Sequence, residues 1–487
     1  MTLRTFRSFL VLSLLVPIGT YLYTLYMATT TKAEGAIVVG SGLAGLSAAL
    51  QLISHGVPVR LLDRAAKPGG NSIKASSGIN AAPTRFQTVP DAAFYDDTIR
   101  SAGSAFSSAR EQREKLISTL VKDSASAVYW LNDEKGIDLS VVAQLGGHTV
   151  PRTHRPAKST VGASIVITLL NQLKESSLFQ LETEARVTRV LKAGERVTGV
   201  EYTCEGETKE LLGPVVFATG GFAGDAQGLL ATYRPDLAGY PSTNDPREGT
   251  QSLLTEVGAQ LLDMDMVQVH PTGFVDPKAP ASPLKFLAAE ILRGEGGLLL
   301  MDGKRFVNEM ETRQHITNAI TKHQSEEGEV KQWDVQVVLD EGTYHAAETH
   351  LGFYLWKGLM RKTTVGELGA VVQPSIQEYA DAASGRTVDL FGRTAFGHWT
   401  LEKVEPDSVV YVGKVTPVVH FTMGGVVISE KSEVLDEDGK AIPGLWAAGE
   451  ITGGIHGENR LGGSSLLECV VFGRIAGDQA AEAFKSA

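Results

Sequence analysis

Cysteine is scarce in this sequence, which contains only Cys204 and Cys469 among 487 residues. Two cysteines are too few for a disulfide framework or for a cysteine-held metal cluster. No C-x-x-C-H pattern is present, which excludes the usual attachment motif of a c-type haem. We expect both cysteines to be buried and without a chemical role.

Positive charge is also low relative to negative charge. Lys and Arg together number 45, against 56 for Asp and Glu, which gives a net charge of -11 at pH 7. No nucleic acid partner is therefore expected, because no basic excess exists to neutralise phosphates. A small anionic substrate would have to be met by a local cluster of Arg and His. Hydrophobic residues make up 43% of the chain, which is ordinary for a globular protein of two or three domains.

The N-terminal region, residues 1–32, is predicted to be a signal or anchor segment outside the fold. Arg4 and Arg7 precede a stretch without charges, residues 9–28, which is near the length that spans a bilayer as a helix. A retained anchor, a cleaved signal peptide and a mitochondrial presequence all fit, and the long apolar run favours the first two. We expect the endoplasmic reticulum or the mitochondrion, with membrane attachment through residues 9–28 if the segment is retained. A start at Met27 would give a cytosolic protein.

A glycine-rich turn follows the first apolar run of the main chain. Residues 40–45 match G-x-G-x-x-G between a predicted strand and a small-residue helix, which is the context of a dinucleotide-binding turn. Gly40 permits the tight turn, Gly42 lets the backbone approach a pyrophosphate, and Gly45 lets helix and strand pack closely. A second strand ends on Asp63, about 20 residues further on, where a carboxylate can accept hydrogen bonds from a ribose. The alternative is an ordinary glycine-rich turn in a βαβ unit.

The rest of the chain suggests that a second domain is inserted into the first. Hydrophobic periodicity predicts helices within 92–139 and over 162–174, and alternation predicts antiparallel strands over 185–190 and 197–202. A buried strand is expected at 214–218, another at 444–447, and a last helix from 464. Polar helices are predicted over 326–333 and 375–383. We assign 33–267 and 419–487 to one nucleotide-binding domain and 268–418 to the inserted domain.

Five short segments concentrate groups that bind anions or move protons. Each contains His, Arg or Glu, and four of the five also contain glycine. Each alone is weak evidence because such residues are more often structural. Together with a nucleotide-binding turn, they indicate an active site for an anionic substrate. The segments are 268–273, 288–297, 305–313, 420–425 and 453–463.

Four of these segments carry motifs that identify a family resemblance. They are Q-x-H-P-T-G, A-E-x-L-R-G-E-G-G, H-F-T-M-G-G and G-I-H-G-E-N-R-L-G-G-S-S. From about residue 32 to its end, the chain resembles the soluble FAD-dependent fumarate reductases of the fungal type, which are related to the flavoprotein subunits of succinate dehydrogenase. The resemblance implies an α/β fold, in which a Rossmann-like FAD-binding domain carries an inserted α+β capping domain, and a dicarboxylate site between them.

The resemblance also implies roles for three residues in catalysis. Arg313 would protonate one alkene carbon while the flavin delivers hydride to its neighbour. Glu290 and Arg293, three residues apart and so on one helix face, would relay protons from solvent to Arg313. Arginine is an unusual acid because its pKa normally lies above 12, so the role requires close pairing with a carboxylate and a basic carbanion-like carbon.

Four further positions are implied in substrate binding. His420 and Arg460 would hold one carboxylate of the substrate, and His270 would contact the other. Cationic donors are needed there because hydride addition pushes charge onto a carboxylate, which Arg binds in a bidentate manner. Ala289 stands where some bacterial relatives have a substrate-binding Thr, and its backbone N–H could serve instead.

One FAD is implied as the cofactor, and no metal is expected. Succinate dehydrogenase flavoproteins have a His bonded to FAD where this chain has Asn71 and Ser72, so we expect non-covalent FAD. A second G-x-G-x-x-G, a haem motif and a set of iron–sulfur cysteines are all absent from the sequence, so an external donor, either a reduced free flavin or a partner protein, would supply electrons. The FAD-binding residues implied by the resemblance are Gly40, Gly42, Ala44, Gly45, Asp63, Asn71, Ser72, Ser77, Gly78, Val187, Glu450, Ser465 and Leu466.

Two other classes of function remain open. The same fold could reduce another 2-enoate or oxidise a small acid such as aspartate. It could also be a non-catalytic binding module, but such a module would have lost Arg313 or the carboxylate-binding residues, and all of these are present.

Overall fold

The computed structural model describes residues 33–486. The predicted signal or anchor segment and the possible membrane attachment through residues 9–28 lie outside this range. Within the described range, no helix combines the length and the apolar character needed to cross a membrane.

The core of the first domain is a mixed sheet with the strand order β20-β21-β10-β1-β2-β6. All neighbouring pairs are parallel except β20 with β21. The strands at its centre are short, continuous apolar runs, which suits a parallel sheet buried on both faces. The bounds are β1 Ala36–Val39, β2 Val59–Leu62, β6 Phe179–Glu182, β10 Val215–Phe217, β20 Glu433–Leu435 and β21 Ala441–Ala447. The strands expected at 214–218 and 444–447 are confirmed.

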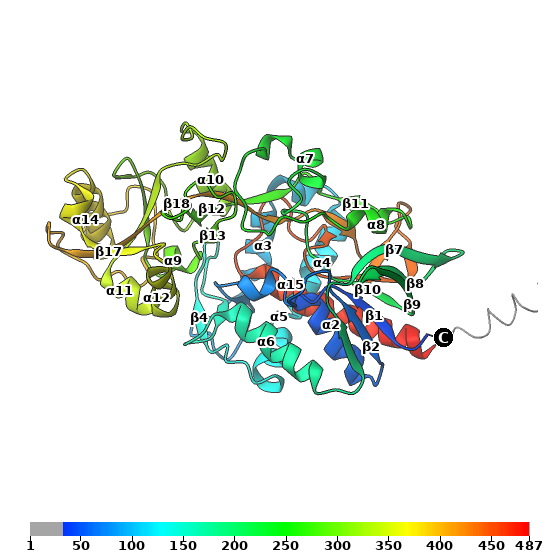
Figure 1. Cartoon of the computed structure of the whole chain (residues 1–487). Helices are drawn as coiled ribbons and strands as arrows, with labels where there is room; N and C mark the ends of the chain where they lie inside the picture. Colours follow the sequence, from blue (N-terminus) through cyan, green and yellow to red (C-terminus); the bar gives the residue numbers. More distant parts are fainter. Residues whose placement is uncertain (1–32, 487) are drawn as a thin grey trace, which may run out of the picture.

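Two helices from opposite ends of the chain pack against each other beside this sheet (Figure 1). They are α2, Leu43–Ser54, and α15, Ser464–Lys485. The small residues of α15 allow the close contact, because a Cβ on Gly473 would lie 2.5 Å from the carbonyl oxygen of Ala44, and one on Gly477 would lie 2.6 Å from that of Ala48. The beginning of α15 is thereby brought close to the beginning of α2.

The predicted antiparallel insertion is confirmed as the sheet β7-β8-β9, Arg186–Ala193, Arg196–Cys204 and Glu207–Leu212. The predicted helix at 162–174 is α6, Val161–Lys174. The region 92–139 is largely helical, as expected, with α3 Phe94–Ala102, α4 Arg110–Lys122 and α5 Ser124–Tyr129 followed by a π-helical turn, Trp130–Glu134. Smaller elements of this domain are β3 Ile79–Asn80, β4 Val141–Ala143, β5 Thr153–Arg155, α7 Leu229–Tyr233, α8 Gln251–Thr255, β11 Leu261–Leu262, β19 Gly425–Val427 and β22 Thr452–Gly453.

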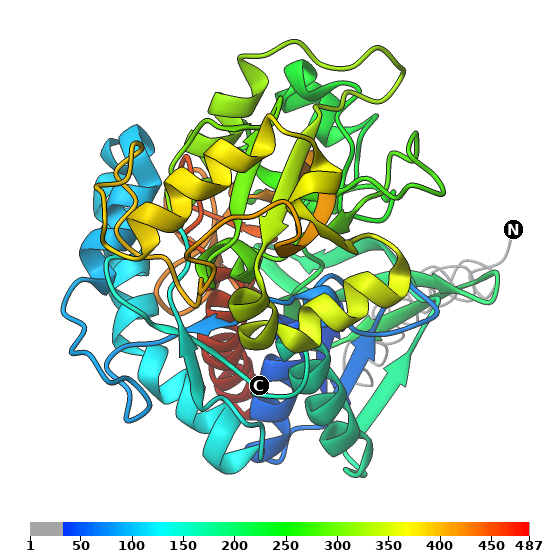
Figure 2. The same cartoon turned by 90° about the vertical axis from the view of Figure 1, so that its left-hand side faces the viewer.

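The second domain, which we call the cap, is built on an antiparallel sheet with the order β13-β12-β18-β16-β14-β15, and β17 also pairs with β18. Its helices lie around this sheet at one side of the molecule (Figures 1 and 2). The strands are β12 Val267–Phe274, β13 Phe286–Leu287, β14 Leu298–Met301, β15 Lys304–Arg305, β16 Val335–Leu339, β17 Arg361–Thr364 and β18 Val409–Thr422. The helices are α9 Ile291–Gly294, α10 Arg313–Thr321, α11 Glu341–Ala346, α12 Glu348–Lys357, α13 Val365–Leu368 and α14 Val372–Ala383.

Of the two polar helices predicted in the cap, the one over 326–333 is wrong. Residues 375–383 belong to α14, but residues 326–333 form a loop. The loop closes on itself where Glu326 N–H donates to the carbonyl oxygen of Gln332 at 2.7 Å, and the Trp333 indole donates to the carbonyl oxygen of His323 at 2.9 Å. Gly328, with φ +157°, leaves the helical conformation in the middle of the segment. These contacts replace the i to i−4 bonds that a helix would have needed.

Candidate active site

A cavity of about 1530 Å³ lies between the nucleotide-binding turn and the cap. Its wall includes residues from both segments of the first domain and from the cap. Fifteen of the twenty predicted site residues line it, and Gly45, Glu290, Arg293, His270 and Ala289 do not. Those that line it are Gly40, Gly42, Ala44, Asp63, Asn71, Ser72, Ser77, Gly78, Val187, Arg313, His420, Glu450, Arg460, Ser465 and Leu466.

The turn between β1 and α2 leaves room for a phosphate. Gly40 has φ +104°, and a Cβ there would lie 2.4 Å from the carbonyl oxygen of Ala218. Gly42 precedes α2 without a capping side chain, so the positive end of the helix dipole faces the cavity. A Cβ on Gly45 would lie 1.9 Å from the carbonyl oxygen of Gly40, so this glycine serves helix packing and not the cavity wall. The geometry fits a dinucleotide pyrophosphate.

Asp63 and Asn71 are held in fixed orientations at this end of the cavity. One oxygen of Asp63 accepts from the backbone N–H of Ser41 at 2.9 Å and from its hydroxyl, and the other accepts from Ala65 N–H at 2.8 Å. The Asn71 amide donates to Asn244, whose own amide donates to the carbonyl oxygen of His420 at 3.0 Å. These bonds connect the loop after β2 to the strand that carries His420.

The second segment of the first domain contributes a helix start and an acidic residue. Gly463, in the left-handed conformation at φ +81°, precedes α15, and Ser465 and Leu466 lie in its first turn beside the cavity. Burial raises the pKa of Glu450 to about 7, although Thr422 N–H donates to its Oε1 at 3.0 Å. A neutral carboxyl group can donate as well as accept, so Glu450 suits contact with ligand hydroxyls.

Arg313 and Glu290 form a buried ion pair at the cap end of the cavity. Arg313 is the first residue of α10, and Glu290 directly precedes α9. Nε and Nη2 of Arg313 lie 2.6 Å and 2.5 Å from Oε2 of Glu290. Burial would raise the pKa of Glu290, but the guanidinium groups of Arg313 and Arg293 outweigh burial and hold it at about 2. The carboxylate is therefore ionised, and it presents Arg313 to the cavity.

Arg293 lies behind this pair, away from the cavity wall. Its Nη2 is 3.9 Å from Oε1 of Glu290, and its Nη1 donates to the carbonyl oxygen of Glu309 at 2.7 Å. Burial lowers the pKa of Arg293 to about 10. The Glu309 carboxylate in turn binds Arg305, at 3.0 and 2.8 Å, and Arg393, at 3.0 Å. Arg293 thus lies between Glu290 and a second cluster of charged residues inside the cap, formed by Glu309, Arg305 and Arg393.

The three predicted carboxylate-binding residues lie at different depths. Arg460 and His420 line the cavity, whereas His270 is fully buried and does not line it. The rings of His270 and His420 pack edge to face, with their centroids 5.4 Å apart. Nε of Arg460 and Nε2 of His270 are buried and have no hydrogen-bond partner among the described residues. Burial lowers the pKa of Arg460 to about 9, and burial together with Arg313 lowers the pKa of both histidines well below the usual value. Unsatisfied buried donors are typical of a binding site that a ligand completes.

A bulge in the long strand β18 aims His420 at the cavity. Gln268 pairs with Phe421 and the next residue, Val269, pairs with Val419, so His420 is the extra residue of the pair of strands. Nδ1 of His420 is hydrogen-bonded to the hydroxyl of Thr243 at 2.9 Å. The guanidinium of Arg460 lies over the Phe421 ring, 4.4 Å from its centroid, in a cation–π contact.

The backbone N–H of Ala289 already has a partner. It donates to the hydroxyl of Tyr354 at 3.2 Å, and Ala289 is not part of the cavity wall. Tyr354 lines the cavity and was not anticipated from the sequence. Gln268, which accepts from Nη1 of Arg313 at 3.1 Å, was missed as a functional residue although it begins the Q-x-H-P-T-G motif.

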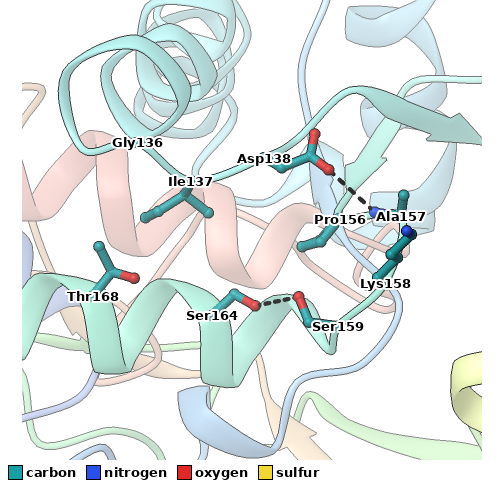
Figure 3. A pocket seen from close by; sticks show the side chains of 9 residues that line it. All are labelled: Gly136, Ile137, Asp138, Pro156, Ala157, Lys158, Ser159, Ser164 and Thr168. Atoms are coloured by element: carbon teal, nitrogen blue, oxygen red, sulfur yellow. Dashed lines mark hydrogen bonds between the residues drawn. The ribbon is translucent and has the colours of Figure 1, made fainter.

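A second, smaller cavity of about 390 Å³ lies beside α6 (Figure 3). Asp138 and Lys158 are its charged residues, and Asp138 is hydrogen-bonded to the backbone of Ala157 at 3.4 Å. It has no cluster of cations comparable to that of the large cavity. Among residues 33–486, no group of three or more His, Cys, Asp or Glu is placed to hold a metal ion.

Comparison with known proteins gives a consistent result. Residues 35–466 match the family model of the FAD binding domain. The chain is 41% identical over 481 residues to a fumarate reductase of Schizosaccharomyces pombe, covering 93% of this chain and 90% of the relative. It is 42% identical over 471 residues to fumarate reductase 1 of Saccharomyces cerevisiae, covering 91% and 98%. Among solved structures, the open conformation of a flavocytochrome c3 fumarate reductase superposes with a TM-score of 0.71 at 31% identity, covering 96% of this chain and 81% of that one.

The fold and the site therefore define an FAD-dependent oxidoreductase. The chain belongs to the FAD binding domain family.

Proposed function

We propose that this protein reduces fumarate to succinate, with Arg313 as the proton donor. The observation that carries the proposal is that Arg313, held by its ion pair with Glu290, lines the same cavity as His420, Arg460 and the nucleotide-binding turn. The names of the fungal relatives support fumarate as the substrate.

The cations of the cavity suit a substrate with two carboxylates. Arg460 and His420 are available to one carboxylate, because the Arg460 guanidinium is not paired with any carboxylate in residues 33–486. Arg313 faces the same space, and His270 supports His420 from behind. The negative charge that develops on a carboxylate during reduction would meet donors that are already in place.

Bound FAD would supply a hydride equivalent to one alkene carbon. Arg313 would then give a proton from its guanidinium to the other carbon, so that the C=C bond becomes a CH–CH bond and Arg313 is left neutral. Glu290, ionised before the step, would then take a proton from Arg293 and pass it to the neutral Arg313, which restores the ion pair. Arg293, 3.9 Å from Glu290, would regain its proton from solvent.

Electrons would come from an external donor, either a reduced free flavin or a partner protein, and FAD would be held without a covalent bond. Asn71, at the position expected for a covalent histidine, is engaged with Asn244. We also propose that residues 1–32 direct the chain to the endoplasmic reticulum or the mitochondrion. The charge-free stretch 9–28 supports this proposal, and a fluorescent fusion with and without residues 1–26 would test it.

The alternative substrate is another 2-enoate. It is favoured by Ala289, which brings no hydroxyl to the cavity and whose N–H is already used by Tyr354. Anaerobic oxidation of reduced methyl viologen by fumarate, crotonate and other enoates separates the two. Fumarate should give the highest kcat/KM, and a higher value with a monocarboxylate would contradict the proposal.

Two variants test the proton donor. Arg313→Ala should abolish turnover with fumarate, and Arg313→Lys should retain a small fraction, while both keep bound FAD. Arg361→Ala, an exposed arginine of the cap, is the matched control and should leave turnover unchanged. Unchanged turnover in Arg313→Ala would show that another group donates the proton.

A further inference from the structure

One face of helix α12 touches both the FAD-binding part of the cavity and its catalytic end. His350, Phe353 and Tyr354, spaced at i, i+3 and i+4, all line the cavity. Nε2 of His350 is hydrogen-bonded to the carbonyl oxygen of Ser76 at 2.8 Å, in the loop that leads to Ser77 and Gly78. The helix belongs to the cap, so this bond spans the two domains.

Tyr354 connects the same helix to the segment that carries Glu290. Its hydroxyl accepts from the backbone N–H of Ala289 at 3.2 Å and donates to the carbonyl oxygen of Leu287 at 3.1 Å. The ring packs on Phe274 of β12 at 4.6 Å between centroids. Burial raises the pKa of Tyr354 to about 12, so the hydroxyl stays protonated and both bonds persist over the working range of pH.

The backbone that Tyr354 holds determines where the Glu290 carboxylate lies. Ala289 precedes Glu290 directly, and both residues are almost fully buried. One oxygen of Glu290 accepts from Gly146 N–H at 2.9 Å, and the other binds Arg313. Without the tyrosine hydroxyl, the buried N–H of Ala289 and the half-buried carbonyl group of Leu287 would lose this partner, and the segment before Glu290 would have to shift to satisfy them.

We infer that Tyr354 is a positioning residue for the Glu290–Arg313 pair, and that α12 sets the place of this pair relative to the FAD-binding loop. The inference rests on the proposed function, since Arg313 is taken as the proton donor. Tyr354 acts through the backbone of residues 287–289 and needs no contact with the reacting atoms.

The test compares Tyr354→Phe with Tyr202→Phe in the FAD-loaded protein. Tyr202 is the matched control, because it is also buried and its hydroxyl also makes a hydrogen bond, to Glu182 at 2.9 Å. It lies in β8, which is well separated from α9, the helix that Glu290 precedes (Figure 1). Tyr354→Phe should keep its FAD and lower kcat for fumarate roughly tenfold, the loss expected for one hydrogen bond. Tyr202→Phe should keep the kcat of the unmodified protein.

Two further measurements separate positioning from general loss of packing. The charged and titratable groups around Glu290 are Arg313, Arg293 and His148. If the carboxylate withdraws from Arg313, its pKa rises, so the acid limb of the kcat–pH profile should move to higher pH in Tyr354→Phe alone. Hydrogen–deuterium exchange should become faster over residues 286–294 in the same variant and stay unchanged in Tyr202→Phe.

The inference is overturned if Tyr354→Phe retains the kcat, the pH profile and the exchange rate of the unmodified protein. It is equally overturned if kcat falls while the profile and the exchange over 286–294 do not change. If the unmodified protein does not reduce fumarate at all, the proposed function fails, and the exchange measurement alone still decides whether Tyr354 holds the segment before Glu290.

Discussion

Two nitrogens of Arg313 bind the same oxygen of Glu290. Nε and Nη2 of the arginine lie 2.6 Å and 2.5 Å from Oε2 of the glutamate. The other glutamate oxygen is taken by the backbone of Gly146, which belongs to the first domain. The carboxylate therefore has no freedom to turn away from Arg313. It also joins the cap to the first domain at the point where the proposed chemistry occurs.

Glu290→Gln removes the charge of this carboxylate while keeping its shape. We expect kcat for fumarate to fall about 100-fold, equivalent to about 3 kcal/mol, because Arg313 loses its counter-charge and its source of protons. Anaerobic turnover with reduced methyl viologen measures the loss, at constant FAD content. Glu311→Gln, an exposed carboxylate two residues before Arg313, should retain full turnover. A variant at Glu290 with normal kcat would remove the residue from the proposed relay.

Gly42 and Gly45 should respond differently to alanine. A Cβ on Gly42 would meet only Ser72 Oγ, at 3.4 Å, so Gly42→Ala should fold with a stability loss of about 1 kcal/mol, yet bind FAD at least tenfold more weakly because the methyl group enters the phosphate site. A Cβ on Gly45 would collide with the carbonyl oxygen of Gly40 at 1.9 Å, so Gly45→Ala should destabilise the FAD-free protein itself. Thermal unfolding and FAD titration distinguish the two effects. Equal FAD affinity in Gly42→Ala and the unmodified protein would contradict the assignment of the turn.

Glu309 is expected to be important for stability. Its carboxylate is fully buried and bound by Arg305, Arg393 and the N–H of Leu299. Glu309→Gln would leave the buried guanidinium of Arg393 without its carboxylate partner and Arg305 with Asp389 alone, and we expect a loss of roughly 3–5 kcal/mol in the free energy of unfolding. Denaturant unfolding measures it. The matched control is Glu402→Gln, whose exposed pair with Arg386 at 3.6 Å should contribute less than about 1 kcal/mol.

The raised pKa of Glu450 predicts a pH dependence of stability in the FAD-free protein. With a pKa near 7 in the fold, against an ordinary value of 4.5, the carboxyl group binds its proton more tightly when folded. The fold is therefore penalised as the pH rises from 4.5 to 7, by about 3 kcal/mol in total, and the penalty is constant above that range. Glu450→Gln should remove it, so the melting temperature of the variant should exceed that of the unmodified protein by an amount that grows between pH 5 and pH 7.5. Parallel melting curves across this range would count against the assignment.

Much of the fold could be predicted because its signals are local. The glycines of 40–45, the apolar runs of β1 and β10, and the alternation in β7 and β8 each reflect a rule that operates within a few residues. The polar stretch 326–333 was mispredicted because its composition suits a helix, whereas a contact between Glu326 and Gln332 determines its path. Such a contact has no periodic signature.

The site was predicted less completely than the fold. The motifs brought Arg313, Glu290 and the histidines to attention, but the depth of each residue could not be inferred from spacing. His270 and His420 both lie in short motifs that contain glycine, yet only His420 lines the cavity. The bulge in β18 orients the His420 side chain toward the cavity. Tyr354 and Thr243 were missed because an isolated tyrosine or threonine gives no signal until the chain brings it against Ala289 or His420.

The cap is joined to the first domain by two strands that are neighbours, since the chain enters it along β12 and leaves along β18, with Gln268 opposite Phe421. The points at which the chain enters and leaves the cap thus lie on neighbouring paired strands, and a turn of a few residues could join them directly. The intervening polypeptide is in this sense a module that evolution or an engineer can exchange without lengthening or reconnecting the rest of the chain. Substrate preference can then diverge while the nucleotide-binding domain, in which α2 packs against α15, stays unchanged.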